Sequence, residues 1–260
     1  MQTPSLAGSL DGRVAIITGA GSGMGAATAR LFGRAGAQVI LSDIDQAGGH
    51  AVAASIAEAG GTATFVRCDV SREDDVAQLV AATVERFGRL DCAVNNAAIH
   101  PDERPIVDAD LAMFDRQMAV NLRSILLCMK YQFRQFLAQR SPGSIVNIGS
   151  VSSQRARPNN AGYVAAKHGM IGLTRTGALE GAPDQIRVNA VLPGAIETPM
   201  LQESLRKRNV TAADIAPNFS LLGRLGRPEE VAEASLWLCS DMSSYVTGQL
   251  IAVDGGYLGR

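Results

Sequence analysis

Seven short apolar segments alternate with helical segments along almost the entire sequence. The apolar segments, each of strand length, cover residues 13–18, 38–42, 62–67, 91–95, 143–148, 187–192 and 249–253. Helical periodicity separates most of them, over residues 23–36, 45–59, 72–87, 111–139, 161–180 and 228–238. Strands that alternate with helices form parallel sheets through right-handed crossover connections. The sequence therefore predicts an α/β fold: a doubly wound parallel sheet of about seven strands with helices on both faces.

The composition agrees with a parallel sheet that is buried on both faces. Hydrophobic residues make up 47% of the 260 residues but aromatic residues only 5%, so most apolar side chains are aliphatic. No linker rich in proline, glycine or serine divides the chain. We therefore expect a leader over residues 1–12 and a single domain over residues 13–260.

The charge balance and the cysteine pattern argue against several kinds of partner. The chain has 24 basic and 25 acidic residues without a like-charged block, so we expect no nucleic acid or membrane partner. Neither a signal peptide nor a membrane-spanning segment is recognisable. The four cysteines have neither metal-site spacing nor a disulfide framework. We expect buried thiols, no metal and a cytoplasmic location.

A glycine-rich turn, Thr-Gly-Ala-Gly-Ser-Gly-Met-Gly, separates the first strand from the first helix. Glycines in this place allow backbone N–H groups and a helix N-terminus to approach a pyrophosphate. Two spacings fit: G-x-G-x-x-A through Gly21, Gly23 and Ala26, and G-x-x-x-G-x-G through Gly19, Gly23 and Gly25. Both predict a Rossmann-type, nucleotide-binding domain, and an ordinary flexible turn is the alternative.

Asp43 ends the second strand, 18 residues after Gly25. A carboxylate in this position can accept hydrogen bonds from both hydroxyls of a ribose. A 2′-phosphate would meet its negative charge, and the flanking Ser22 and Ile44 provide no cation. We therefore expect NAD rather than NADP, with capping of the following turn as the alternative role. Asp69 ends the third strand and could contact the adenine amino group or cap the next helix.

Tyr163 and Lys167 are spaced i, i+4, so on a helix they share one face. A phenol has a pKa near 10, and an ammonium beside it favours the phenolate. Lowering this pKa by about 2 units requires about 3 kcal/mol of differential interaction. On its own the pair is far more typical of a helix in which the tyrosine packs and the lysine is solvated.

With these features in order, the chain resembles the short-chain dehydrogenase/reductase family from Gly12 to about Tyr257. The order and spacing of its short motifs are specific to that family. One departure is Ala98, where the family usually has the glycine of Asn-Asn-Ala-Gly, and its methyl could tighten the backbone beside a cofactor. The matching stretches are Thr18 to Gly25, Asp69-Val70, Asn95 to Ala98, Asn121, Ser150, Tyr163 with Lys167, Arg187 to Asn189, and Pro193-Gly194 with Thr198.

The resemblance implies four catalytic residues: Asn121, Ser150, Tyr163 and Lys167. Tyr163 would exchange a proton with the substrate while a hydride moves to or from nicotinamide. Ser150 would orient the substrate oxygen, and Lys167 would lower the pKa of Tyr163 and bind the nicotinamide ribose. Asn121 would hold a water that links the lysine to solvent.

Two of these roles have alternatives. From the sequence alone, Ser152 and Ser153 compete with Ser150, and only the family spacing selects the latter. Without the resemblance, Asn121 is best interpreted as a surface residue in a helix.

The resemblance also implies cofactor contacts and an assembly. Ile196 and Thr198 would face the nicotinamide carboxamide, and Asn95 and Ala97 would line the cofactor groove. A homotetramer is implied, with the helices over 111–139 and 161–180 packed between subunits. The full set of implied cofactor-binding residues is Gly19, Ser22, Gly23, Met24, Gly25, Asp43, Ile44, Asp69, Val70, Asn95, Ala97, Tyr163, Lys167, Pro193, Gly194, Ile196 and Thr198.

The substrate must be selected by the variable loops. Residues 195–222 are amphipathic and are predicted to form a substrate lid, although a surface helix pair has the same pattern. His100 could touch substrate or lie exposed in its loop, and Arg155 and Arg157 could meet a substrate anion or support a subunit contact.

We expect an NAD-dependent oxidoreductase that interconverts a secondary alcohol and a ketone on a hydrophobic or cyclic substrate, either steroid-like or a cyclic diol. One alternative is a 3-oxoacyl thioester reductase, which would favour NADPH against the charge of Asp43. Another is a non-catalytic NAD-binding sensor or scaffold, and the presence of Ser150, Tyr163 and Lys167 argues against it.

Overall fold

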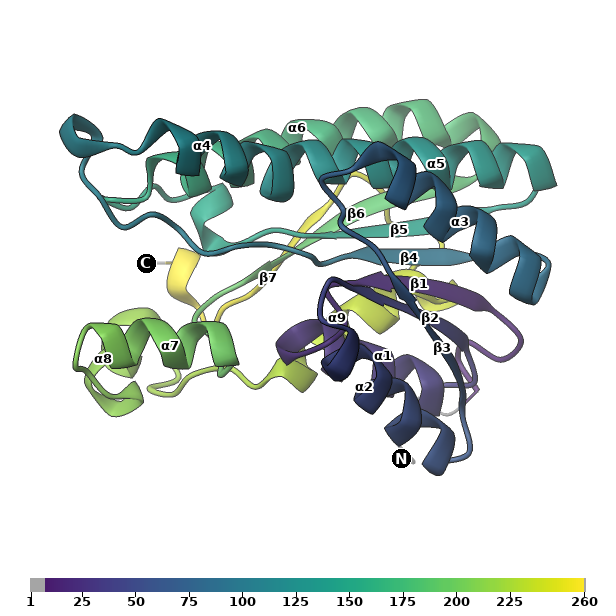
Figure 1. The fold of residues 1–260 in the computed structure, drawn as a ribbon, viewed down its shortest axis with the longest axis horizontal. Coiled ribbons are helices and arrows are strands. Elements are labelled where there is room, and N and C mark those ends of the chain that lie inside the picture. The colour runs from purple at the N-terminus through teal and green to yellow at the C-terminus, as the bar shows by residue number, and fades with distance from the viewer. Residues whose placement is uncertain (1–7, 260) are drawn as a thin grey trace.

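The computed structural model describes residues 8–259 and contains a seven-stranded parallel sheet (Figure 1). The strand order is β3-β2-β1-β4-β5-β6-β7, which confirms the predicted doubly wound sheet. Successive strands are added on one side of β1 up to β3 and on its other side from β4 onward, and this switch point between β1 and β4 creates a crevice at the carboxyl edge. The strands are β1 (Val14–Thr18), β2 (Gln38–Asp43), β3 (Thr62–Arg67), β4 (Cys92–Asn95), β5 (Gly143–Ile148), β6 (Ile186–Pro193) and β7 (Leu250–Val253).

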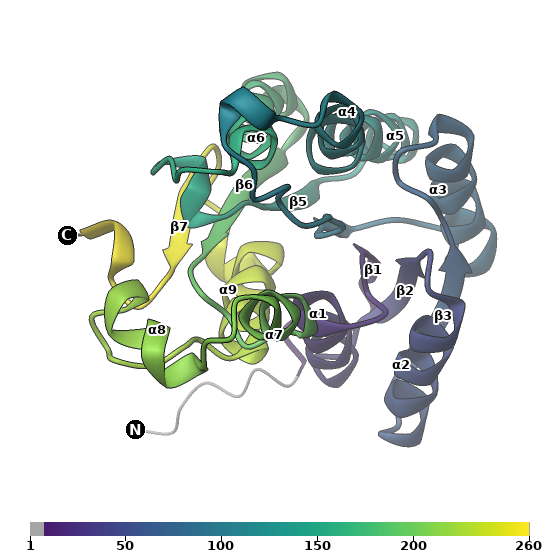
Figure 2. The ribbon, with the colours of Figure 1, turned by 60° about the vertical axis from the view of Figure 1, so that its left-hand side comes forward.

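Helices cover both faces of the sheet (Figures 1 and 2). One face carries α3 (Glu73–Phe87), α4 (Leu111–Met118), α5 (Ser124–Gln139) and α6 (Ala161–Gly181). The opposite face carries α1 (Gly23–Arg34), α2 (Gln46–Glu58) and α9 (Pro228–Cys239). Two further helices, α7 (Pro199–Lys207) and α8 (Ala212–Phe219), lie beyond β6 at the carboxyl edge. Among residues 8–259, no helix combines the length and the apolar character needed to cross a bilayer.

The two faces of each central strand contribute to separate apolar layers. In β1, Ala15 and Ile17 pack with Phe32 of α1, whereas Ile16 packs with Leu79 of α3. All five residues of β1 are buried, which explains why the strand is a continuous apolar run rather than an alternating one.

The helix predicted over residues 111–139 is interrupted at Asn121. A π-helical turn, Ala119–Arg123, joins α4 to α5. The Asn121 side chain is fully buried: its Oδ1 accepts the Ile99 N–H at 2.8 Å and its Nδ2 donates to the Ile99 carbonyl at 3.1 Å. The interpretation of Asn121 as a surface residue is therefore wrong. π-helical turns of this kind are frequent at functional sites.

The region predicted as a lid, residues 195–222, contains the two helices α7 and α8. Thr198 caps α7 by accepting the N–H of Leu201 at 3.2 Å, and Pro199 follows at the first helical position. A small apolar cluster that includes Leu205 and Ile215 joins α7 to α8, apart from the two main layers. Helices α7 and α8 therefore have a core of their own.

Candidate active site

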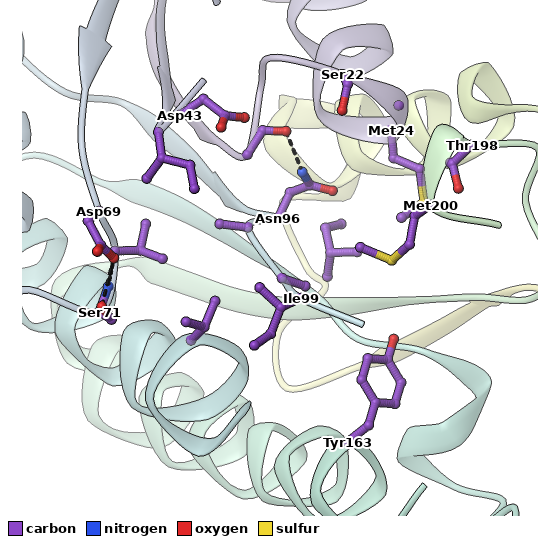
Figure 3. Close-up of a pocket in the computed structure, with 18 of the residues that line it drawn as sticks. Ser22, Met24, Asp43, Asp69, Ser71, Asn96, Ile99, Tyr163, Thr198 and Met200 are labelled. Atoms are coloured by element: carbon purple, nitrogen blue, oxygen red, sulfur yellow. Dashed lines mark hydrogen bonds between the residues drawn. The ribbon is translucent and has the colours of Figure 1, made fainter. Parts of the chain in front are cut away.

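A cavity of about 390 Å³ lies at the switch point between β1 and β4 (Figure 3). It is bounded by residues that follow the carboxyl ends of β1 to β5, together with α4, α6 and the start of α7. Most of the predicted cofactor residues line it: Gly19, Ser22, Gly23, Met24, Asp43, Ile44, Asp69, Val70, Ala97, Tyr163, Lys167 and Thr198.

Glycine is required at three positions of the turn after β1. Gly19 and Gly23 have φ values of +65° and +54°, which favour glycine. A Cβ on Gly25 would lie 2.0 Å from the Gly19 carbonyl oxygen. Gly25 does not line the cavity, but its lack of a side chain lets α1 begin against the turn. These three positions match the G-x-x-x-G-x-G spacing.

Asp43 both supports the turn and lines the cavity. Its Oδ2 accepts the Gly21 N–H at 2.8 Å, and its Oδ1 accepts the Asp45 N–H at 3.0 Å. Asp43 therefore caps the following turn, as in its alternative role, and also lines the cavity. The cationic residues that line this cavity, Arg116 and Lys167, come from α4 and α6 rather than from the segments beside Asp43.

Asp69 stabilises the turn after β3. Its Oδ1 accepts the backbone N–H of Ser71 at 3.0 Å and the Ser71 hydroxyl at 2.7 Å, as Figure 3 shows. The residue that caps α3 is Arg72, so Asp69 is not the helix cap. It lines the cavity from this turn.

Asn95 does not reach the cavity, and the prediction that it lines the groove is wrong. Its amide lies in the core, where Nδ2 donates to Asn147 at 2.9 Å and Oδ1 accepts from Gln132 at 2.8 Å. The next residue, Asn96, lines the cavity and donates to the carbonyl oxygens of Thr18 and Gly19, both at 3.0 Å. Successive side chains of a strand point to opposite faces, and this alternation in β4 was the signal for Asn96.

A second cavity of about 190 Å³ adjoins the first. Pro193, Gly194 and Ile196 line this one rather than the larger cavity, so their predicted cofactor contacts would have to be made from here. Helices α7 and α8 contribute an apolar wall. The residues common to both cavities are Met24, Gly149, Tyr163, Thr198 and Met200.

Tyr163 stands where the two cavities meet. Its phenol projects from α6 into the open space, opposite Met200 (Figure 3). Ser150, which lines the smaller cavity, hydrogen-bonds the phenol. Ser153 instead accepts the backbone N–H of Ser150 at 3.2 Å, and Ser152 donates its N–H to the Ser150 hydroxyl at 3.1 Å. Ser152 and Ser153, the alternatives to Ser150 in the sequence, therefore both hydrogen-bond to Ser150.

Burial controls the acidity of both Tyr163 and Lys167. It raises the pKa of Tyr163, while the hydrogen bond with Ser150 and the charge of Arg157 act in the opposite direction. It lowers the pKa of Lys167 to about 8. The Lys167 ammonium donates to the Ile148 carbonyl at 2.8 Å and lies 5.7 Å from the centre of the phenol ring. The prediction that Lys167 lowers the pKa of Tyr163 is therefore wrong for the protein alone.

The loop after β4 meets the lid at the smaller cavity. His100 lines this cavity, and its Nε2 lies 3.6 Å from a carboxylate oxygen of Glu203 on α7. Glu103 of the same loop accepts the Ser204 hydroxyl at 3.2 Å. His100 is thus partly buried at the lid rather than exposed in its loop.

Known proteins match this chain over almost its full length. A family model described as "Enoyl-(Acyl carrier protein) reductase" matches residues 19–258. The short chain dehydrogenase/reductase astE of Aspergillus oryzae is 43% identical over 249 residues, which cover 95% of each chain. The 2,5-dichloro-2,5-cyclohexadiene-1,4-diol dehydrogenase of Sphingobium indicum is 42% identical over 248 residues, covering 95% of this chain and 98% of that protein. The crystal structure of levodione reductase matches with a TM-score of 0.89 and 37% identity, over 96% and 99% of the two chains.

Proposed function

Because the chain belongs to the short-chain dehydrogenase/reductase family, we propose that it interconverts a secondary alcohol and a ketone with NAD as the hydride carrier. The observation that carries the proposal is the position of Tyr163 between two adjoining cavities. The larger cavity has the backbone turn and the carboxylate that suit a dinucleotide, and the smaller one has an apolar wall. A phenol at their junction can exchange a proton with a substrate that faces the dinucleotide.

The wall of the larger cavity supports NAD. Gly19 and Gly25 keep side chains away from the turn, and the N-terminus of α1 provides unpaired N–H groups for a pyrophosphate. Asp43 can accept hydrogen bonds from ribose hydroxyls and would repel a 2′-phosphate. A volume of about 390 Å³ lies within the ~300–1,000 Å³ of ordinary ligand sites.

In the proposed reaction, Tyr163 and Ser150 of this chain handle the proton and the substrate oxygen. A bound nicotinamide would accept the hydride in oxidation and supply it in reduction. A substrate oxygen beside Ser150 and Tyr163 can accept a hydrogen bond from each hydroxyl. Tyr163 donates its proton in reduction and receives the alcohol proton in oxidation. Lys167, whose pKa is about 8, keeps a positive charge at neutral pH, 5.7 Å from the centre of the phenol ring, where its ammonium can bind a nicotinamide ribose.

The smaller cavity supports a monocyclic substrate. Its volume of about 190 Å³ lies below the usual ~300–1,000 Å³ range, which favours a single ring over a fused steroid-like system. Leu201, Ile215 and Phe219 of the lid provide apolar contacts. The diol dehydrogenase described above acts, by its name, on a six-membered ring. We propose a cyclic secondary alcohol or diol, enclosed by a lid over residues 195–222.

The same family membership supports a homotetrameric enzyme, and its free, buried cysteines agree with the reducing, cytoplasmic location that we propose. Leu111 on α4, Leu126 on α5 and Leu179 on α6 are 72%, 52% and 79% exposed, so these helices present apolar surface on one face of the subunit. Packing between subunits would cover them. Light scattering of the purified protein tests this proposal, and a monomeric mass would contradict it.

The proposed reaction is tested by comparing wild type with Tyr163→Phe. Absorbance of the reduced nicotinamide is followed with NAD⁺ or NADP⁺ and a panel of cyclic alcohols, and with NADPH and a 3-oxoacyl thioester. We expect NAD⁺-dependent oxidation of at least one cyclic alcohol by wild type and a loss of roughly 10³-fold or more in the variant. Preferential turnover of the thioester would favour the acyl reductase alternative. Equal rates for the two proteins on every substrate would favour a non-catalytic sensor.

A further inference from the structure

Arg157 is a guanidinium within the smaller cavity, close to the reacting phenol. It lines the cavity together with Ser150 and Tyr163, and its positive charge acts on Tyr163 directly. Resting on the function proposed above, we infer that Arg157 binds a carboxylate of the substrate, so that the preferred substrate is a cyclic secondary alcohol bearing an anionic group.

The Arg157 guanidinium makes a cation–π contact rather than a hydrogen bond to the lid. Its Cζ lies over the Phe219 ring, 4.7 Å from the ring centre. Phe219 in turn stacks on Tyr257, with ring centres 5.7 Å apart and planes inclined by 12°. A cation–π contact restricts the guanidinium without engaging its N–H donors in a hydrogen bond to an oxygen, so these donors are available to a ligand. A planar fork of donors is suited to bidentate binding of a carboxylate.

The described part of the protein does not pair Arg157 with a carboxylate. Within residues 8–259, Arg157 has neither an ion pair nor a hydrogen-bond acceptor. Among the other charged residues of this cavity, Glu103 accepts a hydrogen bond from Ser204, and Arg208 is a second, exposed cation at the end of α7. A partly buried guanidinium without a counter-ion favours the binding of an anion.

The competing interpretation is that Arg157 only fastens the lid through Phe219. Arg155 provides the matched control, because its guanidinium lies 4.9 Å from the centre of the Tyr257 ring but does not line the cavity. The two arginines therefore make similar ring contacts, and they differ in access to the substrate.

The test uses 4-hydroxycyclohexanecarboxylate and its neutral, nearly isosteric carboxamide, with NAD⁺ and the full-length protein. For each protein the measured quantity is the ratio of kcat/KM for the carboxylate to kcat/KM for the carboxamide. This ratio cancels any general effect of a substitution on Tyr163 or on the lid. We expect a wild-type ratio of roughly 10 to 100, which is the range for charge-assisted hydrogen bonds.

In Arg157→Leu the ratio should fall to about 1, mainly through KM for the carboxylate, whereas Arg155→Leu should retain the wild-type ratio. Affinity for NAD⁺, measured by tryptophan or nucleotide fluorescence, shows that each variant is folded. A wild-type ratio near 1 with turnover of both compounds would overturn the inference and leave the proposed function standing. A ratio that survives in Arg157→Leu would reduce Arg157 to a lid contact. No turnover of any cyclic alcohol would overturn both proposals.

Discussion

The ammonium of Lys167 donates a hydrogen bond to the backbone carbonyl of Ile148, 2.8 Å away at the end of β5. The lysine is only 2% exposed, and this burial lowers its pKa to about 8. A carbonyl rather than the phenol oxygen therefore holds the charge, which lies 5.7 Å from the centre of the Tyr163 ring. This arrangement sets the response of proton transfer to pH.

Ketone reduction should be constant near neutral pH and should fall as the pH passes about 8. Below that pKa Lys167 is charged, and the raised pKa of Tyr163 keeps the phenol protonated as the proton donor. Alcohol oxidation should instead rise with pH, since it requires the phenolate. Initial rates in both directions over the neutral to alkaline range check this, and a reduction rate that increases through pH 8 would contradict it.

Replacing Lys167 by Met should remove a pH dependence of stability. The pKa of Lys167 is lowered from 10.5 to about 8 in the folded protein, so the unfolded chain binds more protons between these values. Wild type should therefore gain about 3 kcal/mol of unfolding free energy relative to the variant as the pH rises from 7 to 10.5. Urea unfolding of both proteins at the two pH values measures this difference, and parallel pH curves would argue against it.

Gly25→Ala should abolish dinucleotide binding, since its Cβ would lie 2.0 Å from the Gly19 carbonyl oxygen and force the turn away from α1. Gly172→Ala on α6 is the matched control, because no atom lies within 4 Å of its added Cβ. We expect this control to bind NAD normally and to gain about 0.5–1 kcal/mol in stability from its helix propensity. Calorimetric titration with NADH and thermal unfolding test the pair, and normal binding by Gly25→Ala would be inconsistent with the assigned turn.

Asp43→Asn should weaken NAD binding by roughly 10-fold and reduce the discrimination against NADP, because the variant lacks the negative charge that repels a 2′-phosphate. Asp45→Asn removes the same charge two residues away while retaining an acceptor for the Gly48 N–H, so it should change neither affinity. Dissociation constants for both dinucleotides decide this. Equal effects of Asp43→Asn and Asp45→Asn would mean that the negative charge of this region affects dinucleotide affinity without a direct contact from Asp43.

Asn121→Ala should release the Ile99 backbone. The loss of both hydrogen bonds leaves the half-buried N–H and C=O of Ile99 without these partners, at a cost of about 2 kcal/mol. Gln117→Ala is the control, because Gln117 donates only to the neighbouring His100 carbonyl at 2.8 Å. Hydrogen exchange should quicken at the Ile99 amide in the first variant and not in the second. Continued protection of Ile99 in Asn121→Ala would show that the π-helical turn does not depend on this contact.

Sequence patterns were most informative where the structure of a segment depends on the residues next to it in the chain. The apolar run of β1, the glycines at positive φ and the i, i+4 pair on α6 follow from local geometry. Sequence patterns failed where two adjacent residues of the same type could each occupy the same position in the site. Asn95 and Asn96 are adjacent and chemically identical. Strand alternation separates them, and the pairing of β4 with its neighbours decides that Asn96 rather than Asn95 faces the cavity.

The lid shows a further limit of sequence patterns. Its amphipathic pattern fits both a cover and a surface helix pair, because local periodicity indicates that a helix has an apolar side without indicating what that side contacts. Likewise, Arg155 and Arg157 are equivalent in the sequence, yet only Arg157 lines the smaller cavity.

The sequence by itself determined the doubly wound sheet, the glycine turn and the Tyr163–Lys167 spacing, because strand and helix periods are properties of neighbouring residues. The tertiary structure alone decided that Lys167 is held by Ile148, that Asn121 holds Ile99, and that Tyr163 separates two cavities. These relationships join residues that are distant in the chain, and they also depend on burial, which sets the pKa of a lysine and of a phenol. Strand order and helix packing bring such groups together, and no local pattern contains that information.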